Sequence, residues 1–190
     1  MRFIETLLIT DKIENLNYHN DRFNKTRKDF FNLKKDDLQK YVKIIPNKRV
    51  RITYSKEIEK IEYFELKKRE FKKFKLIHSN IEYSYKYAYR EKLNVLKEKG
   101  YDEVIIVKHG FITDTTISNL AFFDGKKWYT PQNPLLKGTK REELIRKKLI
   151  HPKKIHYKEL KNFKKFAMIN AIIGFYEIDI TSIENFGKIK

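Results

Sequence analysis

Residues 83–90 read Tyr-Ser-Tyr-Lys-Tyr-Ala-Tyr-Arg, in which every second side chain is a tyrosine. In a β-strand alternate side chains point to opposite faces, so one face would carry the tyrosines and the other Ser84, Lys86 and Ala88. The small neighbours leave space beside the amine of Lys86, and the tyrosines can exclude water behind it. Desolvation lowers the pKa of a lysine and makes its neutral, nucleophilic form accessible. We therefore predict that Lys86 carries covalent chemistry as a Schiff-base lysine.

The abundance of basic residues offers a simpler explanation of Lys86. Lysine and arginine number 43, so one lysine considered alone is most simply a solvated surface charge. The 190 residues, 41% of them hydrophobic, suffice for one packed domain or two small ones. Cysteine is absent, which excludes disulfides and thiolate metal sites. No metal site is expected from the spacing of the histidines His78, His109, His151 and His156.

No targeting or membrane signal is evident in the sequence. The first six residues include Glu5 before any apolar segment develops, which is unlike a signal peptide. There is no run of about eighteen apolar residues, so no helix is expected to span a membrane. Together with the lack of cysteine, these features predict a cytoplasmic protein without membrane partners.

The formal net charge of +18 has three possible explanations. Lysines that neutralise phosphates and aromatic rings that stack on bases would suit a nucleic acid. A positive field would also attract small anionic substrates and cofactors. The simplest explanation is a general bias of composition, and the spread of lysines over the whole chain fits it. Because there is no basic arm, a nucleic-acid partner is the least favoured of the three.

The first 80 residues are expected to form a small antiparallel sheet with one helix. Helical spacing leads from about residue 18 to Phe31. Strand patterns occupy residues 2–9, 49–54, 58–66 and 71–78. Charged residues alternate loosely with apolar ones in these stretches, as in a half-solvated antiparallel sheet.

The second half combines short strands with two helices. Residues 91–99 have helical spacing and stop at Gly100, and a helix over 139–149 opens with the capping-box spacing of Thr139 and Glu142. A hairpin turn is expected at Asp124-Gly125. Strands are expected at residues 104–107, 111–113, 119–123, 126–130, 166–170 and 175–180.

Polar residues at the ends of these elements could together build a binding site. Gly138-Thr139 precedes a helix, whose first amides and macrodipole favour phosphate, although such a threonine is commonly only a cap. The other polar positions lie beside strand ends: Asp114, Ser118-Asn119 and Asn170-Ala171. Each alone is more simply structural. A reactive lysine, a phosphate cradle and a carboxylate for a ring nitrogen are what pyridoxal 5′-phosphate (PLP) requires of a protein.

The order of these motifs resembles the class IV aminotransferase family, the PLP enzymes of fold type IV. This family includes branched-chain and D-amino acid aminotransferases and 4-amino-4-deoxychorismate lyases. The resemblance rests on Gly110-Phe-Ile-Thr-Asp114-Thr-Thr-Ile-Ser118-Asn119, then Thr130-Pro131, then Gly138-Thr139-Lys140-Arg141. Outside this run, the similar motifs are Glu5-Thr6, His19-x-x-Arg22 and Ile169-Asn170-Ala171, the last being similar to a second phosphate loop.

The resemblance implies roles for particular residues. Lys86 would be the Schiff-base lysine, and Asp114 stands where the family has a glutamate facing the pyridine nitrogen. The cofactor would further be bound by Arg22, Ser118, Asn119, Thr139, Lys140, Asn170 and Ala171. Among these, Arg22 and the amides of Thr139 and Lys140 would hold the phosphate. An aspartate is one methylene shorter than a glutamate, so it must approach the ring more closely or act through water.

These implications predict an α+β protein of PLP fold type IV, similar to D-amino acid aminotransferase. A small N-terminal antiparallel-sheet domain would cover residues 1–82, and a larger α/β PLP-binding domain residues 83–190. We expect a homodimer with PLP as cofactor and a small, anionic amino compound as substrate. The favoured activity is 4-amino-4-deoxychorismate lyase, which eliminates pyruvate and gives 4-aminobenzoate for folate synthesis. The compact form and the run at residues 85–90 resemble lyase-like modules.

Three alternatives stay open at this point. Amino acid transamination, of the branched-chain or D-amino acid type, is the runner-up, and the sequence does not decide between it and the lyase. A basic nucleic-acid-binding protein without cofactor would bind polyanions in a salt-dependent manner. A degenerate family member would bind PLP without turnover, an alternative that the aspartate at position 114 keeps open.

Overall fold

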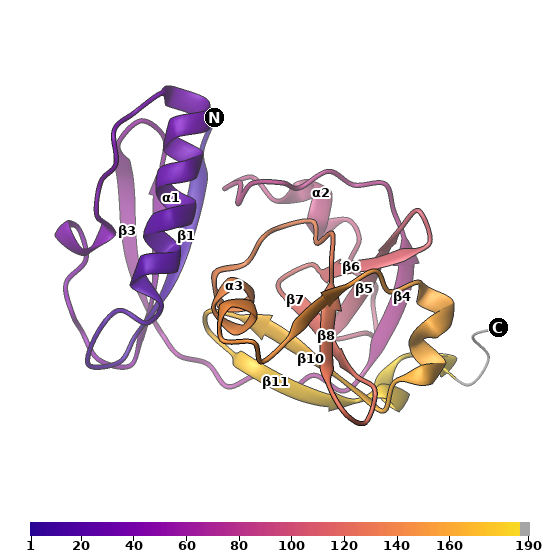
Figure 1. Ribbon diagram of the computed structural model, residues 1–190. Helices are drawn as coiled ribbons and strands as arrows, with labels where there is room; N and C mark the ends of the chain where they lie inside the picture. The colour runs from indigo at the N-terminus through magenta and orange to yellow at the C-terminus, as the bar shows by residue number, and fades with distance from the viewer. Residues whose placement is uncertain (187–190) are drawn as a thin grey trace. The chain divides into compact units, whose positions relative to one another are not determined.

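The computed structural model describes residues 1–186 and divides into two compact units (Figure 1). The first contains residues 1–68 and 85–89, and the second contains residues 69–84 and the chain from Arg90 onward. The sequence predicts one division, between residues 82 and 83, whereas the structure returns the segment that carries Lys86 to the first unit. The expected α+β architecture, with a small antiparallel sheet and a larger mixed unit, is confirmed.

The first unit is a three-stranded antiparallel sheet with a helix packed on one face (Figure 1). The strands are β1 (Phe3–Ile9), β2 (Lys48–Tyr54) and β3 (Ile58–Glu65), in the order β1-β2-β3. The helix is α1 (Leu16–Phe31), and a short 3₁₀ helix, η1 (Leu38–Lys40), follows it. In β2 every second residue is buried, as the half-solvated pattern predicts: Val50, Ile52 and Tyr54.

The segment 85–89 runs beside β1 at the edge of this sheet. The amide of Ile4 donates to the carbonyl of Lys86 at 2.9 Å. The amide of Ala88 donates to the carbonyl of Arg2 at 3.0 Å. Only an isolated bridge forms here rather than a regular strand, yet it fixes the backbone of Lys86 against β1.

The tyrosines of this segment follow the predicted alternation in part. Tyr85 and Tyr87 both pack against the buried ring of Phe3, with centroid distances of 6.3 and 5.4 Å. Tyr89 is 76% exposed, and Tyr83 belongs to the second unit. Two of the four tyrosines, Tyr85 and Tyr87, therefore lie on a common face and pack against the core of the first unit.

The second unit contains two sheets. The smaller sheet consists of β4 (Phe74–His78), β5 (Glu103–Lys108) and β6 (Phe111–Thr115), with β4 parallel to β5 and β6 antiparallel to it. The larger sheet has the order β11-β10-β7-β8-β9. Its strands are β7 (Asn119–Phe123), β8 (Trp128–Pro131), β9 (His151–Lys153), β10 (Lys165–Asn170) and β11 (Gly174–Asp179).

The strand predicted over residues 71–78 is β4, but the prediction that it joins the small antiparallel sheet is wrong. Phe74 is fully buried and meets Phe166 edge to face at 4.9 Å, so β4 contributes to the core of the second unit. The connection from β4 to β5 contains only a short helix, α2 (Glu91–Asn94), in place of the helix predicted over 91–99. A parallel pair needs a long connection of this kind.

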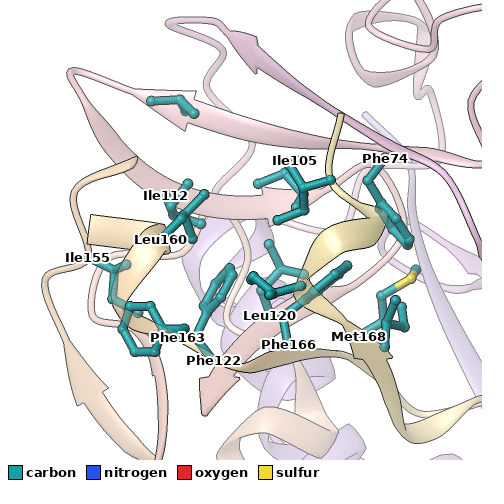
Figure 2. Packing of buried hydrophobic residues seen from close by; sticks show 14 of the residues in the cluster. Phe74, Ile105, Ile112, Leu120, Phe122, Ile155, Leu160, Phe163, Phe166 and Met168 are labelled. Atoms are coloured by element: carbon teal, nitrogen blue, oxygen red, sulfur yellow. The ribbon is translucent and has the colours of Figure 1, made fainter. Parts of the chain in front are cut away.

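Side chains from both sheets form the core of the second unit (Figure 2). Phe74, Ile105 and Ile112 come from β4, β5 and β6, and Leu120, Phe122, Phe166 and Met168 come from β7 and β10. β6 and β7 are consecutive strands of different sheets, joined by residues 116–118. The predicted residue Ser118 lies within this short connection, and Asp114 and Asn119 lie in the strands on either side of it.

The remaining elements complete the second unit. Helix α3 (Thr139–Arg146) packs against β10 and ends three residues earlier than the predicted 149. Two 3₁₀ helices, η2 (Tyr157–Asn162) and η3 (Ile180–Ser182), flank the last two strands. Within residues 1–186 no helix has the length and apolar character needed to cross a membrane.

Candidate active site

A buried charged cluster connects β1 to α1 in the first unit. Glu5 lies in β1 between Phe3 and Leu7, and its side chain is fully buried. Arg22 donates from Nε to Oε1 of Glu5 at 2.8 Å and from Nη2 to Oε2 at 2.6 Å. His19 precedes Arg22 by three positions in α1, is also fully buried, and places Nδ1 2.7 Å from Oε2 of Glu5. Both side chains of the His19-x-x-Arg22 motif therefore hold one carboxylate.

The protonation states of this cluster follow from its burial and charges. Burial raises the pKa of Glu5, but the charge and hydrogen bonds of Arg22 and the hydrogen bond of His19 lower it to about 2. Burial lowers the pKa of His19; Glu5 opposes this shift, and the charges of Arg22 and Lys86 add to it. At neutral pH Glu5 is therefore ionised and His19 is neutral, with Nδ1–H donating to the carboxylate. Arg22 and Lys86, the two predicted site residues of the first unit, share one electrostatic environment.

In the second unit, Asp114 and Asn119 are in direct contact. Asp114 in β6 is 4% exposed, and Asn119, the first residue of β7, is 5% exposed. Asn119 Nδ2 donates to Oδ1 of Asp114 at 2.8 Å and to the carbonyl of Leu136 at 2.7 Å. The amide of Leu136 donates to Oδ2 of Asp114 at 2.9 Å. We call Asp114, Asn119 and Leu136 the carboxylate clamp.

The clamp holds a carboxyl group with an unusual pKa. Burial raises the pKa of Asp114 to about 6, against the opposing effects of the Leu136 amide, Asn119 and the charge of Arg141. The group is therefore mostly ionised at pH 7 and mostly protonated at pH 5. An ionised carboxylate offers about four acceptor positions, and Asn119 and the amides of Leu136 and Leu135 use part of this capacity. A buried acid with a raised pKa is typical of functional sites.

Helix α3 begins beside the clamp. Gly138 is its N-cap and Thr139 is already its first residue, so the predicted capping box of Thr139 and Glu142 is wrong. The N-cap glycine has no side chain that could cap the first turn. Backbone amides at such a helix start favour phosphate through their hydrogen bonds and the helix dipole. The amides of Thr139 and Lys140, the predicted phosphate ligands, lie in this turn.

Packing against the clamp requires glycine at position 138. A Cβ built on Gly138 would lie 2.0 Å from Oδ1 of Asn119, far inside van der Waals contact. Asn119 can yield only by giving up its hydrogen bonds to Asp114 and Leu136. The clamp and the start of α3 therefore form one packed unit.

The Gly138 contact leads to a first testable prediction. We expect Gly138→Ala to lower the free energy of unfolding by about 2–4 kcal/mol, through overpacking and lost buried hydrogen bonds. Backbone strain does not contribute, because φ at Gly138 is −74°. In an Asn119→Ala background the same change should cost less than about 1 kcal/mol, since the obstructing side chain is gone. Urea denaturation of the four proteins measures this, and an equal cost in both backgrounds would contradict the packing argument.

Arg141 fastens the start of α3 to the end of β8. Its side chain is 5% exposed, with Nε donating to Oγ1 of Thr130 at 3.0 Å and Nη2 donating to the carbonyl of Pro131 at 2.8 Å. The Thr130-Pro131 and Gly-Thr-x-Arg motifs are thus in contact. Lys140 forms an ion pair with Glu143 at 2.7 Å, so its side chain is engaged along the helix.

The other predicted residues of the second unit build turns. The hydroxyl of Ser118 lies 2.9 Å from that of Thr115 and closes the β6–β7 connection. Asn170 Nδ2 donates to the carbonyl of Ile117 at 3.2 Å, and its Oδ1 accepts from the amides of residues 172–173 at 2.9 Å. The second unit thus contains Asp114, Ser118, Asn119, Thr139, Lys140, Asn170 and Ala171, whereas Arg22 and Lys86 lie in the first.

A pocket of about 370 Å³ adjoins the clamp in the second unit. Two of its lining residues, Thr113 and Leu135, directly precede Asp114 and Leu136. Its polar lining includes Glu82, Ser84, Lys108, His109, Gln132, Asn133 and Lys154. Lys108 is paired with Glu82, so Lys154 provides the excess positive charge of the pocket.

Sequence reasoning assigned no role to Glu5, His19 or Arg141, although all three stand in the quoted motifs. The clearest available signal was Glu5, a charged residue at a position of an apolar strand that alternation places in the core. The hydrogen bond from Leu136 to Asp114 could not be predicted from the sequence, because its donor is a backbone amide and not a side chain.

Comparison with known proteins finds relatives over most of the chain. The sequence profile of the family described as amino-transferase class IV matches residues 85–180. An uncharacterized protein of Haemophilus influenzae is 37% identical over 182 residues, which cover 90% of this chain and 97% of the relative.

Solved structures share the fold. A protein of Haemophilus somnus 129PT, named as a candidate 4-amino-4-deoxychorismate lyase, superposes with a TM-score of 0.85 at 30% identity, covering 91% of this chain and 97% of its own. A hypothetical aminotransferase of Mycobacterium tuberculosis in its PLP-bound form superposes with a TM-score of 0.76 at 15% identity, covering 99% and 87%. The matching profile and the shared architecture show that the chain belongs to the class IV aminotransferase family, whose members are PLP-dependent enzymes of fold type IV.

Proposed function

We propose that the protein is a 4-amino-4-deoxychorismate lyase that uses PLP to eliminate pyruvate and release 4-aminobenzoate. The observation that carries the proposal is the buried carboxylate of Asp114 packed beside Gly138, the N-cap of α3. When bound, PLP supplies an aldehyde that condenses with amino groups and a ring that accepts the electron pair of a carbanion. The 30% identity to the candidate lyase of H. somnus favours the lyase among the activities of the family.

The residues of the second unit fit the polar groups of PLP. The first turn of α3, with Gly138 as its N-cap, suits a phosphate through its backbone amides. The acceptor capacity of the Asp114 carboxylate beyond these hydrogen bonds suits the N–H of a cationic pyridine ring. The clamp binds both oxygens of the carboxylate and so fixes its orientation.

Each predicted site residue has a role in the proposal. The amine of Lys86 holds the cofactor covalently and moves a proton at the substrate carbon that bears the amino group. Arg22, the amides of Thr139 and Lys140, and the turn at Asn170-Ala171 bind the phosphate. Ser118 and Asn119 act through the turn and the clamp that position Asp114.

An anionic substrate suits the charge of the protein. The net charge of +18 attracts anions at long range, and Lys154 adds positive charge to the pocket beside the clamp. The substrate of the proposed lyase carries two carboxylates. The proposal also includes a homodimer, the assembly typical of the family, which light scattering would test.

The proposal predicts the products of a defined assay. Purified protein with PLP and 4-amino-4-deoxychorismate should release pyruvate and 4-aminobenzoate in equal amounts, with no 2-oxo acid added as a co-substrate. A transaminase would instead require a 2-oxo acid and would exchange amino groups with branched-chain or D-amino acids. Protein whose cofactor has been reduced by borohydride is the matched inactive control.

Other outcomes identify the alternatives. A protein that binds PLP but forms neither set of products would be a degenerate family member. A protein that stays colourless with PLP and binds polyanions with a steep salt dependence would support the nucleic-acid hypothesis. Either result would contradict the lyase.

A further inference from the structure

We propose that Glu5 and His19 are positioning residues that orient the guanidinium of Arg22 for the phosphate of the cofactor. This inference rests on the proposed function, because it takes the phosphate of PLP as the ligand of Arg22. Neither Glu5 nor His19 touches the cofactor in that proposal. Their role is to set the direction of the group that does.

The geometry of the contact fixes the guanidinium in its plane. Nε and Nη2 of Arg22 bind the two oxygens of Glu5 at 2.8 and 2.6 Å, a two-point arrangement that allows neither rotation nor tilt without loss of a hydrogen bond. The contact with Glu5 thereby fixes the direction of the whole guanidinium group.

Stability alone does not account for a carboxylate at position 5. The neighbouring buried positions of β1 on this face are Phe3 and Leu7, so an apolar residue would continue the core. Burying an ion pair costs desolvation that its attraction rarely exceeds, and apolar replacements of buried pairs are often neutral or stabilising. An orienting role for Arg22, whose side chain is 15% exposed, explains why the carboxylate is present.

His19 completes the arrangement by holding the carboxylate itself. Its Nδ1 lies 2.7 Å from Oε2 of Glu5, the same oxygen that accepts from Nη2 of Arg22. A neutral imidazole in this position prevents rotation of the carboxylate without introducing a second cation that would compete with Arg22. His19 thus holds Glu5, and Glu5 holds Arg22, whose side chain is partly exposed.

The test compares PLP with pyridoxal, which has the same ring and aldehyde but no phosphate. Equilibrium binding of both to the full-length protein is measured by visible absorbance. For Glu5→Gln we expect the dissociation constant of PLP to rise about tenfold, the size of one lost charge-assisted hydrogen bond, while that of pyridoxal stays within about twofold. In an Arg22→Ala background, Glu5→Gln should cause no further loss for PLP, because Glu5 acts through Arg22.

His19 provides a second, independent pair of variants. His19→Asn can keep an N–H donor near Oε2 of Glu5 and should retain most of the PLP affinity, whereas His19→Leu removes the donor and should behave like Glu5→Gln. Glu57→Gln, at an exposed turn between β2 and β3, is the matched control and should leave both affinities unchanged. Urea denaturation of each variant verifies that it is folded, and if Glu5→Gln does not fold, the His19 pair decides.

The outcomes separate this inference from the proposed function. Equal weakening of PLP and pyridoxal, or PLP bound by Glu5→Gln as tightly as by the wild type, would overturn the positioning role while leaving a PLP protein. A wild type that binds pyridoxal and PLP equally well would likewise overturn it. A wild type that binds neither compound would overturn the proposed function, and the positioning role with it.

Discussion

Lys86→Ala should lose turnover by roughly 10⁴-fold or more, because one amine supplies both the covalent attachment of the cofactor and the proton transfer. The variant should also lack the bond that borohydride traps, as seen by mass spectrometry of the reduced protein. The structure gives Lys86 a fixed backbone, through the hydrogen bond from Ile4 to its carbonyl, so its replacement should not disturb the segment.

Lys92→Ala is the control for this substitution. Lys92 is an exposed residue of α2, and its loss removes a positive charge without touching the site. It should retain wild-type turnover and covalent attachment. If the Lys86→Ala protein still traps PLP on another lysine and keeps its activity, the assignment of Lys86 is wrong.

Asp114→Asn should lower turnover by about 10²- to 10⁴-fold while covalent attachment at Lys86 persists. An amide cannot stabilise a protonated ring nitrogen as a carboxylate does, so the ring would accept electrons less well. Asp11→Asn, an exposed substitution in the first unit, is the matched control. Full activity in Asp114→Asn would show that the shorter carboxylate does not act on the ring.

The pKa of Asp114 also predicts the pH dependence of the wild type. Because burial raises this pKa to about 6, the ionised form is lost as the pH falls below 6. Activity that needs the carboxylate should then decrease about tenfold per pH unit. A pH profile of turnover measures this, and an acid limb near pH 4 would indicate that Asp114 titrates normally in the working enzyme.

Ionisation of Asp114 should lower the free energy of unfolding, although it is expected to raise turnover. A buried acid whose folded pKa lies above its unfolded value destabilises the fold when it ionises, so its contribution falls as the pH rises from about 4 to 6. The change is about 3 kcal/mol, since each pH unit between the two pKa values corresponds to about 1.4 kcal/mol. The difference between wild type and Asp114→Asn isolates it from Glu5, whose lowered pKa acts in the other direction at lower pH.

The elements with a local signal were predicted well from the sequence. The apolar run at 104–107 is β5, and the Asp124-Gly125 signal marks the turn between β7 and β8. The helix leading to Phe31 ends at that residue. In each case the deciding interactions lie within a few residues of one another, so periodicity and turn chemistry suffice.

The errors concern interactions between distant residues or choices between equivalent patterns. β4 has the alternation of a half-solvated strand, and its parallel pairing with β5 depends on a partner across a long connection. The Thr-x-x-Glu spacing at 139–142 fits a capping box, yet Gly138 takes the N-cap because it alone fits against Asn119. The clamp depends on a backbone amide of the loop before α3, for which no side-chain pattern exists.

The path of the chain has a consequence for its synthesis. The backbone passes between the two units three times, after residues 68, 84 and 89. During translation residues 85–89 leave the ribosome after β1. Until then the amide of Ile4 lacks its partner carbonyl, and the ring of Phe3 lacks its contacts with Tyr85 and Tyr87. A product truncated at residue 68 would keep that open edge permanently and be prone to aggregate. The segment that carries Lys86 thus completes the first unit, so the residue proposed to hold the cofactor reaches its place only when this unit is closed.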